Sequence, residues 1–253
     1  RFGAQKLQAD LRWDHNSAYD NQTTGKLGWG MDIADGWSVR AVAGTAFRAP
    51  TFNDLYYPGY GVATLQAERS RSIEAGVNYK AAMTSLAATA YYNKVSDLIG
   101  YQADPNLCPP GFPFGCAGNT ARALLQGITM QGLQQWGNFQ FTLALDWLNA
   151  KDRDTDEQLP RRAANQQTFA VDWTEGPWQL GGTVLRVSQR PDAGLLLPAY
   201  ALLNLNARWR FERFWQIEAR LQNATGRDYQ PARDYQDVGR QFWIGLRYDG
   251  KGL

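Results

Sequence analysis

The single histidine, His15, is the one side chain with the ordinary chemistry of a general base near neutral pH, and Asp14 and Ser17 lie beside it. Nucleophilic catalysis needs the base within hydrogen-bond reach of the hydroxyl and a third group that orients the base. Neighbouring positions in sequence do not establish that geometry. A lipase-like site is therefore kept as an alternative, and a polar loop at a strand end is the simpler interpretation.

The two cysteines, Cys108 and Cys116, enclose a segment rich in proline, glycine and phenylalanine that has neither helical nor strand periodicity. A metal site would need further cysteine or histidine ligands close by, and His15 is far away in sequence. We therefore predict a Cys108–Cys116 disulfide and an oxidising compartment, with two unpaired structural cysteines as the alternative. No metal site and no cofactor are expected.

The adjacent arginines Arg161 and Arg162 stand at the head of a predicted strand, just after an acidic segment between Lys151 and Glu157. A guanidinium at such a junction can hold a phosphate or a carboxylate through two hydrogen bonds. The alternative is an arginine that forms a salt bridge at the rim of the fold.

The composition is that of a protein with aromatic residues on its surface. The 253 residues include 10 Trp, 12 Tyr and 11 Phe, yet the mean hydropathy is −0.48. The formal net charge is +2 and no long run of like charges occurs, so no nucleic-acid partner is expected. No apolar stretch reaches the roughly 18 residues of a membrane-spanning helix. The sequence opens at Arg1, so we expect any signal peptide to be removed or to lie upstream.

Alternation with a period of two is the dominant pattern and predicts an all-β fold. Between 199 and 211, for example, Leu203, Leu205, Ala207 and Trp209 share one face, and Arg208 and Arg210 lie on the other. About twelve segments show this pattern, near residues 4–14, 23–33, 37–47, 69–80, 84–99, 119–134, 139–150, 160–173, 177–190, 199–211, 214–223 and 239–248.

The connections between these segments alternate between short turns and long loops, as in a transmembrane antiparallel β-barrel of the bacterial outer membrane. Leu203, Leu205, Ala207, Trp209, Ile73, Val77 and Ile244 are then expected to face lipid, and Arg208, Arg210 and Glu74 to face inward. A soluble β-sandwich is the alternative. Segments of about ten residues are longer than sandwich strands usually are, which favours the barrel.

Several motifs resemble those of the TonB-dependent outer-membrane receptors. The longest is Gly44-Thr-Ala-Phe-Arg-Ala-Pro-Thr-Phe-Asn-Asp-Leu-Tyr56, followed by Leu65, Glu68, Ser70, Glu74 and Gly76. Others are Arg12–Ser17, Tyr91–Ile99, Leu159–Ala163, and Leu221–Asn223 with Tyr229, Gly239 and Arg240. Within the family, the Tyr56–Gly61 and Arg161–Ala163 segments look most like those of the cobalamin transporters.

The resemblance implies a barrel of twenty-two strands around a plug that carries the TonB box. We therefore expect residues 1–248 to be the C-terminal part of such a barrel and residues 249–253 to be a tail, with the plug absent. It also implies that Arg161 contacts a corrin-sized ligand together with Tyr56, Tyr57 and Tyr60, for which loop or girdle packing is the alternative. The family's calcium-binding loops would lie in the missing half.

The expected function is TonB-dependent active transport of cobalamin, or of a related large chelate, across the outer membrane. TonB would act through the missing plug, and lipid would surround the barrel. The chain is not expected to be an enzyme. A receptor for haem, a siderophore or another metal chelate is one alternative, and a free-standing twelve-stranded pore is another.

Overall fold

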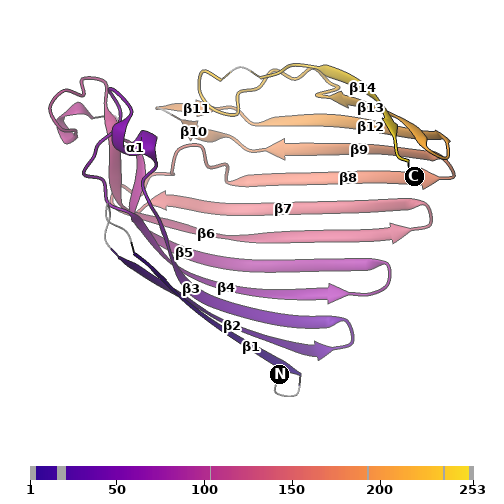
Figure 1. Ribbon diagram of the computed structural model, residues 1–253, viewed down its shortest axis with the longest axis horizontal. Coiled ribbons are helices and arrows are strands. Elements are labelled where there is room, and N and C mark those ends of the chain that lie inside the picture. Colours follow the sequence, from indigo (N-terminus) through magenta and orange to yellow (C-terminus); the bar gives the residue numbers. More distant parts are fainter. Residues whose placement is uncertain (1–3, 16–20, 103, 193, 236, 251–253) are drawn as a thin grey trace. The chain divides into compact units, whose positions relative to one another are not determined.

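The computed structural model describes residues 4–15, 21–102, 104–192, 194–235 and 237–250. Twelve strands form one antiparallel sheet in chain order (Figure 1). They are β1 (Gln5–Asp14), β2 (Gln22–Ala34), β3 (Trp37–Arg48), β4 (Glu68–Lys80), β5 (Thr84–Gln102), β6 (Cys116–Trp136), β7 (Phe139–Asp152), β8 (Asn165–Glu175), β9 (Trp178–Val187), β12 (Tyr200–Glu212), β13 (Trp215–Gln222) and β14 (Gln241–Tyr248). The predicted all-β fold with about twelve long strands is confirmed.

A short helix, a 3₁₀ turn and a two-stranded hairpin lie in the described parts of the long connections. Helix α1 (Phe52–Tyr56) follows β3, and a 3₁₀ turn (Pro105–Leu107) follows β5. Strands β10 (Arg190–Asp192) and β11 (Leu195–Leu197) form a separate two-stranded hairpin. Within the described ranges, no helix combines the length and the hydropathy needed to cross a membrane.

The connections alternate as predicted. Two-residue turns join β2 to β3, β6 to β7, β8 to β9 and β12 to β13, and three residues join β4 to β5, whereas the intervening connections are long. Gly36 and Gly176 have positive φ angles of 75° and 53°. These turns need left-handed backbone, which glycine adopts without steric cost. Because successive connections in an antiparallel meander lie at opposite ends of the strands, the long loops share one end.

The chain divides into two compact units. The first comprises residues 1–77, 90–127 and 149–159, and the second comprises 78–89, 128–148 and 160–253. The first unit holds α1 and the loop that contains the two cysteines. The second holds β8 to β14 with their connections.

Registers in the second unit confirm that the apolar and charged residues occupy opposite faces. Along β12 and β13, Leu205 pairs with Leu221 and Ala207 with Ala219, and these pairs alternate with Asn206–Arg220 and Arg208–Glu218. The Arg208 Nε lies 3.2 Å from Glu218 Oε1, and Arg208 Nη1 donates to Gln179 Oε1 at 2.8 Å. A polar face therefore runs across β9, β12 and β13, with an ion pair between β12 and β13. Opposite it, the Trp178 and Trp209 rings stack at 5.1 Å.

Two predicted strand boundaries are wrong. The segment 160–173 was expected to be one strand, but β8 begins only at Asn165, because the preceding residues form a turn in which Arg161 has a φ of 60°. The segment 177–190 was expected to continue to Arg190, but β9 ends at Val187. Arg190 instead begins β10, whose central residue, Pro191, has no N–H for a continuous ladder.

Candidate functional site

The connection between β3 and β4, residues 49–67, is called the tyrosine loop here. Its helix α1 starts with a capping box in which Asp54 N donates to Thr51 Oγ1 at 3.2 Å and Thr51 N donates to Asp54 Oδ2 at 2.8 Å. After the helix, Gly61 N donates to Tyr57 O at 2.7 Å. A Cβ on Gly61 would lie 2.5 Å from the backbone nitrogens of Tyr56 and Tyr57, so only glycine allows this close return of the chain.

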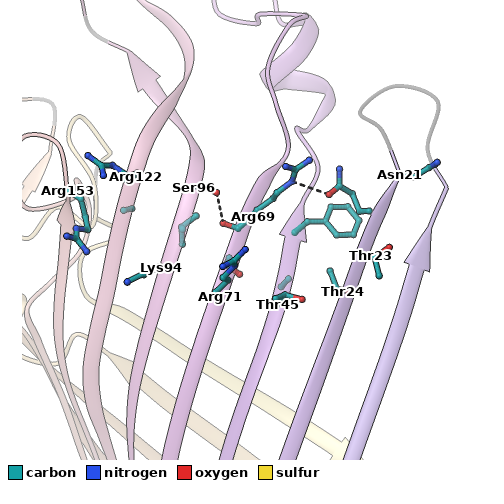
Figure 2. A pocket seen from close by; sticks show the side chains of 16 residues that line it. Asn21, Thr23, Thr24, Thr45, Arg69, Arg71, Lys94, Ser96, Arg122 and Arg153 are labelled. Atoms are coloured by element: carbon teal, nitrogen blue, oxygen red, sulfur yellow. Dashed lines mark hydrogen bonds between the residues drawn. The ribbon is translucent and has the colours of Figure 1, made fainter.

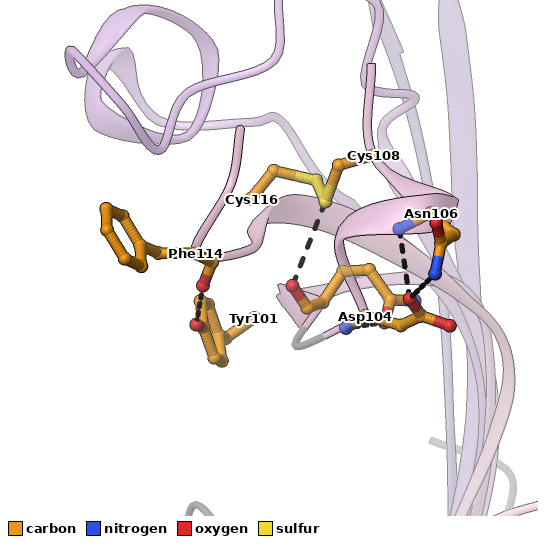
Figure 3. Close-up of a disulfide and its surroundings, with 7 residues drawn as sticks. Tyr101, Asp104, Asn106, Cys108, Phe114 and Cys116 are labelled. Carbon is orange, nitrogen blue, oxygen red and sulfur yellow. Dashed lines mark hydrogen bonds between the residues drawn. A yellow bond between two sulfur atoms is a disulfide. The ribbon is translucent and has the colours of Figure 1, made fainter. Parts of the chain in front are cut away.

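The connection between β5 and β6, described for residues 104–115, is called the disulfide loop. Cys108 and Cys116 are joined as predicted, with their Cα atoms 5.9 Å apart (Figure 3). The Tyr101 hydroxyl donates to the Phe114 carbonyl. Asp104 Oδ1 accepts from Asn106 N at 2.9 Å and so caps the 3₁₀ turn. The loop is therefore fixed by a covalent bond and by local hydrogen bonds.

The tyrosine loop and the disulfide loop pack against each other. Val62 and Leu65 are buried together with Cys116 and Ala117, and Tyr60, Ile99, Cys108, Phe112 and Leu55 pack around them. Ala117 N donates to Tyr60 O at 2.7 Å, so the two loops also share a backbone hydrogen bond. We call this assembly the loop cluster.

A buried carboxylate joins the loop cluster to the strands. Glu68, whose side chain is 12% exposed, accepts from Arg48 Nε at 2.9 Å and from Ile99 N at 2.8 Å. Arg48 also lies 3.7 Å from Asp54 in helix α1. Hydrogen bonds to a charged group are among the stronger ones in proteins, so this contact restrains the base of both loops.

The three predicted tyrosines lie in the loop cluster but have different surroundings. Tyr56 and Tyr57 are 56% and 58% exposed, and the Tyr56 ring lies 5.0 Å from that of Phe52. Tyr60 is half-buried and stacks on Tyr101 at 6.5 Å. Tyr60 therefore contributes to loop packing, whereas the other two rings are accessible to a ligand.

Arg161 lies in the other compact unit, in the connection between β7 and β8. Its Nε lies 3.0 Å from both carboxylate oxygens of Asp192, and its backbone N donates to Pro191 O at 2.8 Å. The Arg161 side chain is nevertheless 56% exposed. The structure therefore contains the rim salt bridge, and it also leaves much of the guanidinium open to solvent.

Asp192 connects three of the long loops. It is 2% exposed, and it accepts from Arg233 N at 2.8 Å as well as from Arg161. Desolvation by burial favours its neutral form, but hydrogen bonds from Arg233 N and Arg161, with the charges of Arg161 and Arg190, outweigh it and lower the pKa of Asp192 below its ordinary value. The ionised carboxylate therefore stabilises this loop contact above that ordinary pKa, and the stabilisation is lost as the pH falls through the lowered pKa.

The residues of the alternative catalytic site do not form a triad in the described part of the chain. His15 Nδ1 lies 2.7 Å from Asn21 Oδ1, and the His15 ring stacks on Trp13. Asp14 Oδ1 accepts from Arg12 instead of orienting the histidine. Ser17 lies outside the described residues.

A cleft that the sequence did not indicate lies on the first unit near the long-loop ends of β2 to β7 (Figure 2). Its volume is about 800 Å³. Among the lining residues that the structure describes, five are basic and none is acidic; the basic ones are Arg69, Arg71, Lys94, Arg122 and Arg153. In the sequence these residues are dispersed over 85 positions, so no local charge run marks them.

The disulfide gives a direct chemical prediction. Peptide mapping of the protein isolated from the cell envelope without reducing agent is expected to recover the peptides of Cys108 and Cys116 as one linked species. After reduction the two peptides should separate. Recovery of two free thiols from protein kept under non-reducing conditions would contradict the assignment.

Long antiparallel strands, a two-faced residue alternation and alternating connection lengths define the class of outer-membrane β-barrels. The family model described as "TonB dependent receptor-like, beta-barrel" matches residues 1–224. The chain belongs to this family, whose members are transporters and receptors of the outer membrane and not enzymes.

Curated relatives include two vitamin B12 transporters named BtuB. That of Vibrio vulnificus (strain YJ016) is 28% identical over 95% of this chain and 40% of its own length. That of Photobacterium profundum is 27% identical over 98% of this chain and 41% of its own length. The chain thus spans about two fifths of the relatives that it matches.

Solved structures share the fold. The copper transporter OprC matches with a TM-score of 0.81 and 18% identity, over 97% of this chain and 47% of that one. A mutant form of the ferric enterobactin receptor PfeA from Pseudomonas aeruginosa, bound to enterobactin, matches with a TM-score of 0.80 and 16% identity. The match covers 98% of this chain and 43% of that one. The names of these proteins refer to different substances, copper and ferric enterobactin, so the fold alone does not define a substrate.

Proposed function

We propose that this chain is the C-terminal barrel part, residues 1–248, of a TonB-dependent transporter that takes up cobalamin across the bacterial outer membrane. In this proposal the long loops bind the substrate, and TonB supplies energy through a plug outside the present sequence. Membership of the TonB-dependent receptor family supports the transport mechanism. The two vitamin B12 transporters among its relatives support the substrate.

The observation that carries the substrate proposal is the exposed aromatic surface of the loop cluster. Phe52, Tyr56, Tyr57 and Phe114 are 79%, 56%, 58% and 85% exposed. Rings held on a fixed scaffold lose little conformational entropy on binding, and their flat faces suit a large planar macrocycle. The capping box, the disulfide and the Arg48–Glu68 ion pair supply that scaffold.

Arg161 is proposed as a polar contact to the same substrate. Its contact with Asp192 uses Nε. The Nη groups retain hydrogen-bond donors suited to an amide carbonyl or a phosphate, both of which cobalamin carries. The Asp192 carboxylate would hold the guanidinium in place while these donors reach the ligand.

The substrate is tested by equilibrium binding to the complete purified receptor, with cobalamin, haem and a ferric siderophore measured side by side. Cobalamin is expected to bind most tightly. Tyr57→Ala should weaken cobalamin binding by about 5–30-fold, because an exposed aromatic anchor contributes about 1–2 kcal/mol when it becomes buried. Met83→Ala is the matched control, because Met83 is 59% exposed and lies in the short connection before β5.

Preferential binding of a siderophore or haem would replace the substrate and leave the transporter class intact. The solved relatives with copper and enterobactin in their names make these the relevant competitors. Equal affinities of wild-type, Tyr57→Ala and Met83→Ala receptors for cobalamin would remove Tyr57 from the site.

A further inference from the structure

The basic residues of the cleft lie on the same face of the sheet as the apolar residues that are expected to contact lipid. In β4 the alternation exposes Arg69 and Arg71 on the face that also carries Ile73, which is 62% exposed. In β5, Lys94 shares a face with Tyr92 and Leu86, which are 37% and 47% exposed.

The neighbouring strands continue this arrangement. In β6, Arg122 has the parity of Ile128 and Met130, which are 42% and 41% exposed. Arg153 follows β7, and its N donates to Arg122 O at 2.9 Å. Ser96 Oγ donates to Arg69 O at 3.4 Å, which joins β5 to β4. Figure 2 shows the basic side chains along these adjacent strands.

The basic residues also lie at a common level along the strands. In each of β4, β5 and β6 the basic residues lie toward the long-loop end, and the exposed apolar residues follow toward the short turn. Each strand residue rises about 3.3 Å, so Arg71 stands only about 7 Å from Ile73. When the apolar face is in hydrocarbon, these charges lie at the level of the lipid head groups on the long-loop side.

Most of this charge has no acidic partner within the described part of the chain. Arg122 is the exception, because it is paired with Asp154. Arg69 Nε donates to a neutral acceptor, Gln22 Oε1, at 3.3 Å. Lys94 Nζ lies 5.5 Å from the Tyr92 ring centre. The cleft also carries hydroxyl groups suited to an anion, among them those of Thr45 and of Ser96, which shares the face of Lys94 in β5.

We propose that this basic patch, Arg69, Arg71, Lys94, Arg122 and Arg153, binds the phosphate groups of an anionic lipid in the outer leaflet around the barrel. Clustered arginine and lysine at a membrane surface attract anionic head groups, and guanidinium groups bind phosphate through paired hydrogen bonds. The lipid side of the patch distinguishes it from a substrate site inside the barrel. The inference rests on the proposed membrane orientation but not on the proposed substrate.

The test measures binding of the complete receptor in neutral nanodiscs to diphosphorylated lipid A, with dephosphorylated lipid A and inorganic phosphate as comparison probes. The double variant Arg71→Gln/Lys94→Gln is expected to weaken binding of the phosphorylated lipid more than about tenfold, because each surface charge contributes about a factor of five. Arg213→Gln, an exposed arginine in the short turn before β13, is the control and should bind as wild type.

Wild-type receptor should prefer the phosphorylated lipid, and millimolar inorganic phosphate should not displace it. Displacement by phosphate would show a site for the free ion and overturn the lipid assignment. Binding of the phosphorylated lipid by the double variant as tightly as by wild type would also overturn it. A folded barrel changes its mobility on a gel when it is heated, and this shift is used to check that each variant is folded. If the double variant does not fold, Arg71→Gln alone is the milder variant. Cobalamin affinity in the same samples should be unchanged, so failure of the substrate proposal is recognised separately.

Discussion

Replacement of Leu205 by arginine is expected to destabilise the folded receptor in lipid bilayers, lowering its free energy of unfolding by about 2–4 kcal/mol. Arginine at Asn206 should lower it much less. The two residues are adjacent near the middle of β12, which spans Tyr200–Glu212. They differ mainly in the face of the sheet that they occupy. The measurement is denaturant unfolding of the complete receptor in lipid vesicles.

The registers explain why the effects should differ. Leu205 lies between Gly182 and Leu221, with its Cδ2 3.5 Å from the Cβ position of Gly182, so an arginine there enters the apolar face. Asn206 lies between Gly181 and Arg220 and beside Asp172, which can accept a hydrogen bond from a new guanidinium. Equal destabilisation at both positions would reject the assignment of the faces.

Arg161→Ala is expected to weaken cobalamin binding to the complete receptor by about 1.5–3 kcal/mol, the range for a hydrogen bond to a charged group that binding desolvates. That corresponds to about 10–150-fold in affinity. A rim salt bridge alone predicts less than about 1 kcal/mol. The measurement is ligand affinity on cells at matched surface expression, with Arg213→Ala at a short turn as the control.

Because Arg161 also forms a salt bridge with Asp192, a second variant is needed to separate ligand binding from loop stabilisation. Asp192→Asn removes the charge that holds the guanidinium but retains Arg161 itself. If Arg161 binds the ligand, Asp192→Asn should weaken binding by less than Arg161→Ala does. Equal losses would show that the salt bridge acts only by fixing the loops, and an Arg161→Ala affinity equal to that of Arg213→Ala would remove Arg161 from the site.

The strands were predictable because each long segment has to alternate between two different surroundings. The residues from Leu203 to Trp209 alternate between apolar and polar, and they lie in strand β12 as this pattern predicts. The boundaries near Arg161 and Arg190 were not predictable, because they depend on tertiary contacts. Arg161 bonds to Asp192 and Pro191, and Arg190 Nε donates to Pro231 O at 3.2 Å, contacts that span 30 or more residues.

The candidate site was predictable only in part. The residue types of Tyr56 and Tyr57 and the cysteine spacing indicated an aromatic loop and a closed loop, but not that the two loops pack together. Packing of Tyr60 on Tyr101 was not predictable, because it depends on how two loops meet. The basic patch was missed for a similar reason. Its members come from three strands and from the residue that follows a fourth, and only the strand order and the shared face bring them together.

The central claim is tested most directly by the uptake of labelled cobalamin into cells in which the complete receptor is the sole cobalamin receptor. Uptake should be saturable, and it should fall to the level of receptor-free cells when TonB is deleted, although cobalamin still binds at the surface. Uptake that persists without TonB would contradict the account, because it would show a passive pore. Surface-exposed receptor without any cobalamin binding or uptake would contradict the proposed substrate.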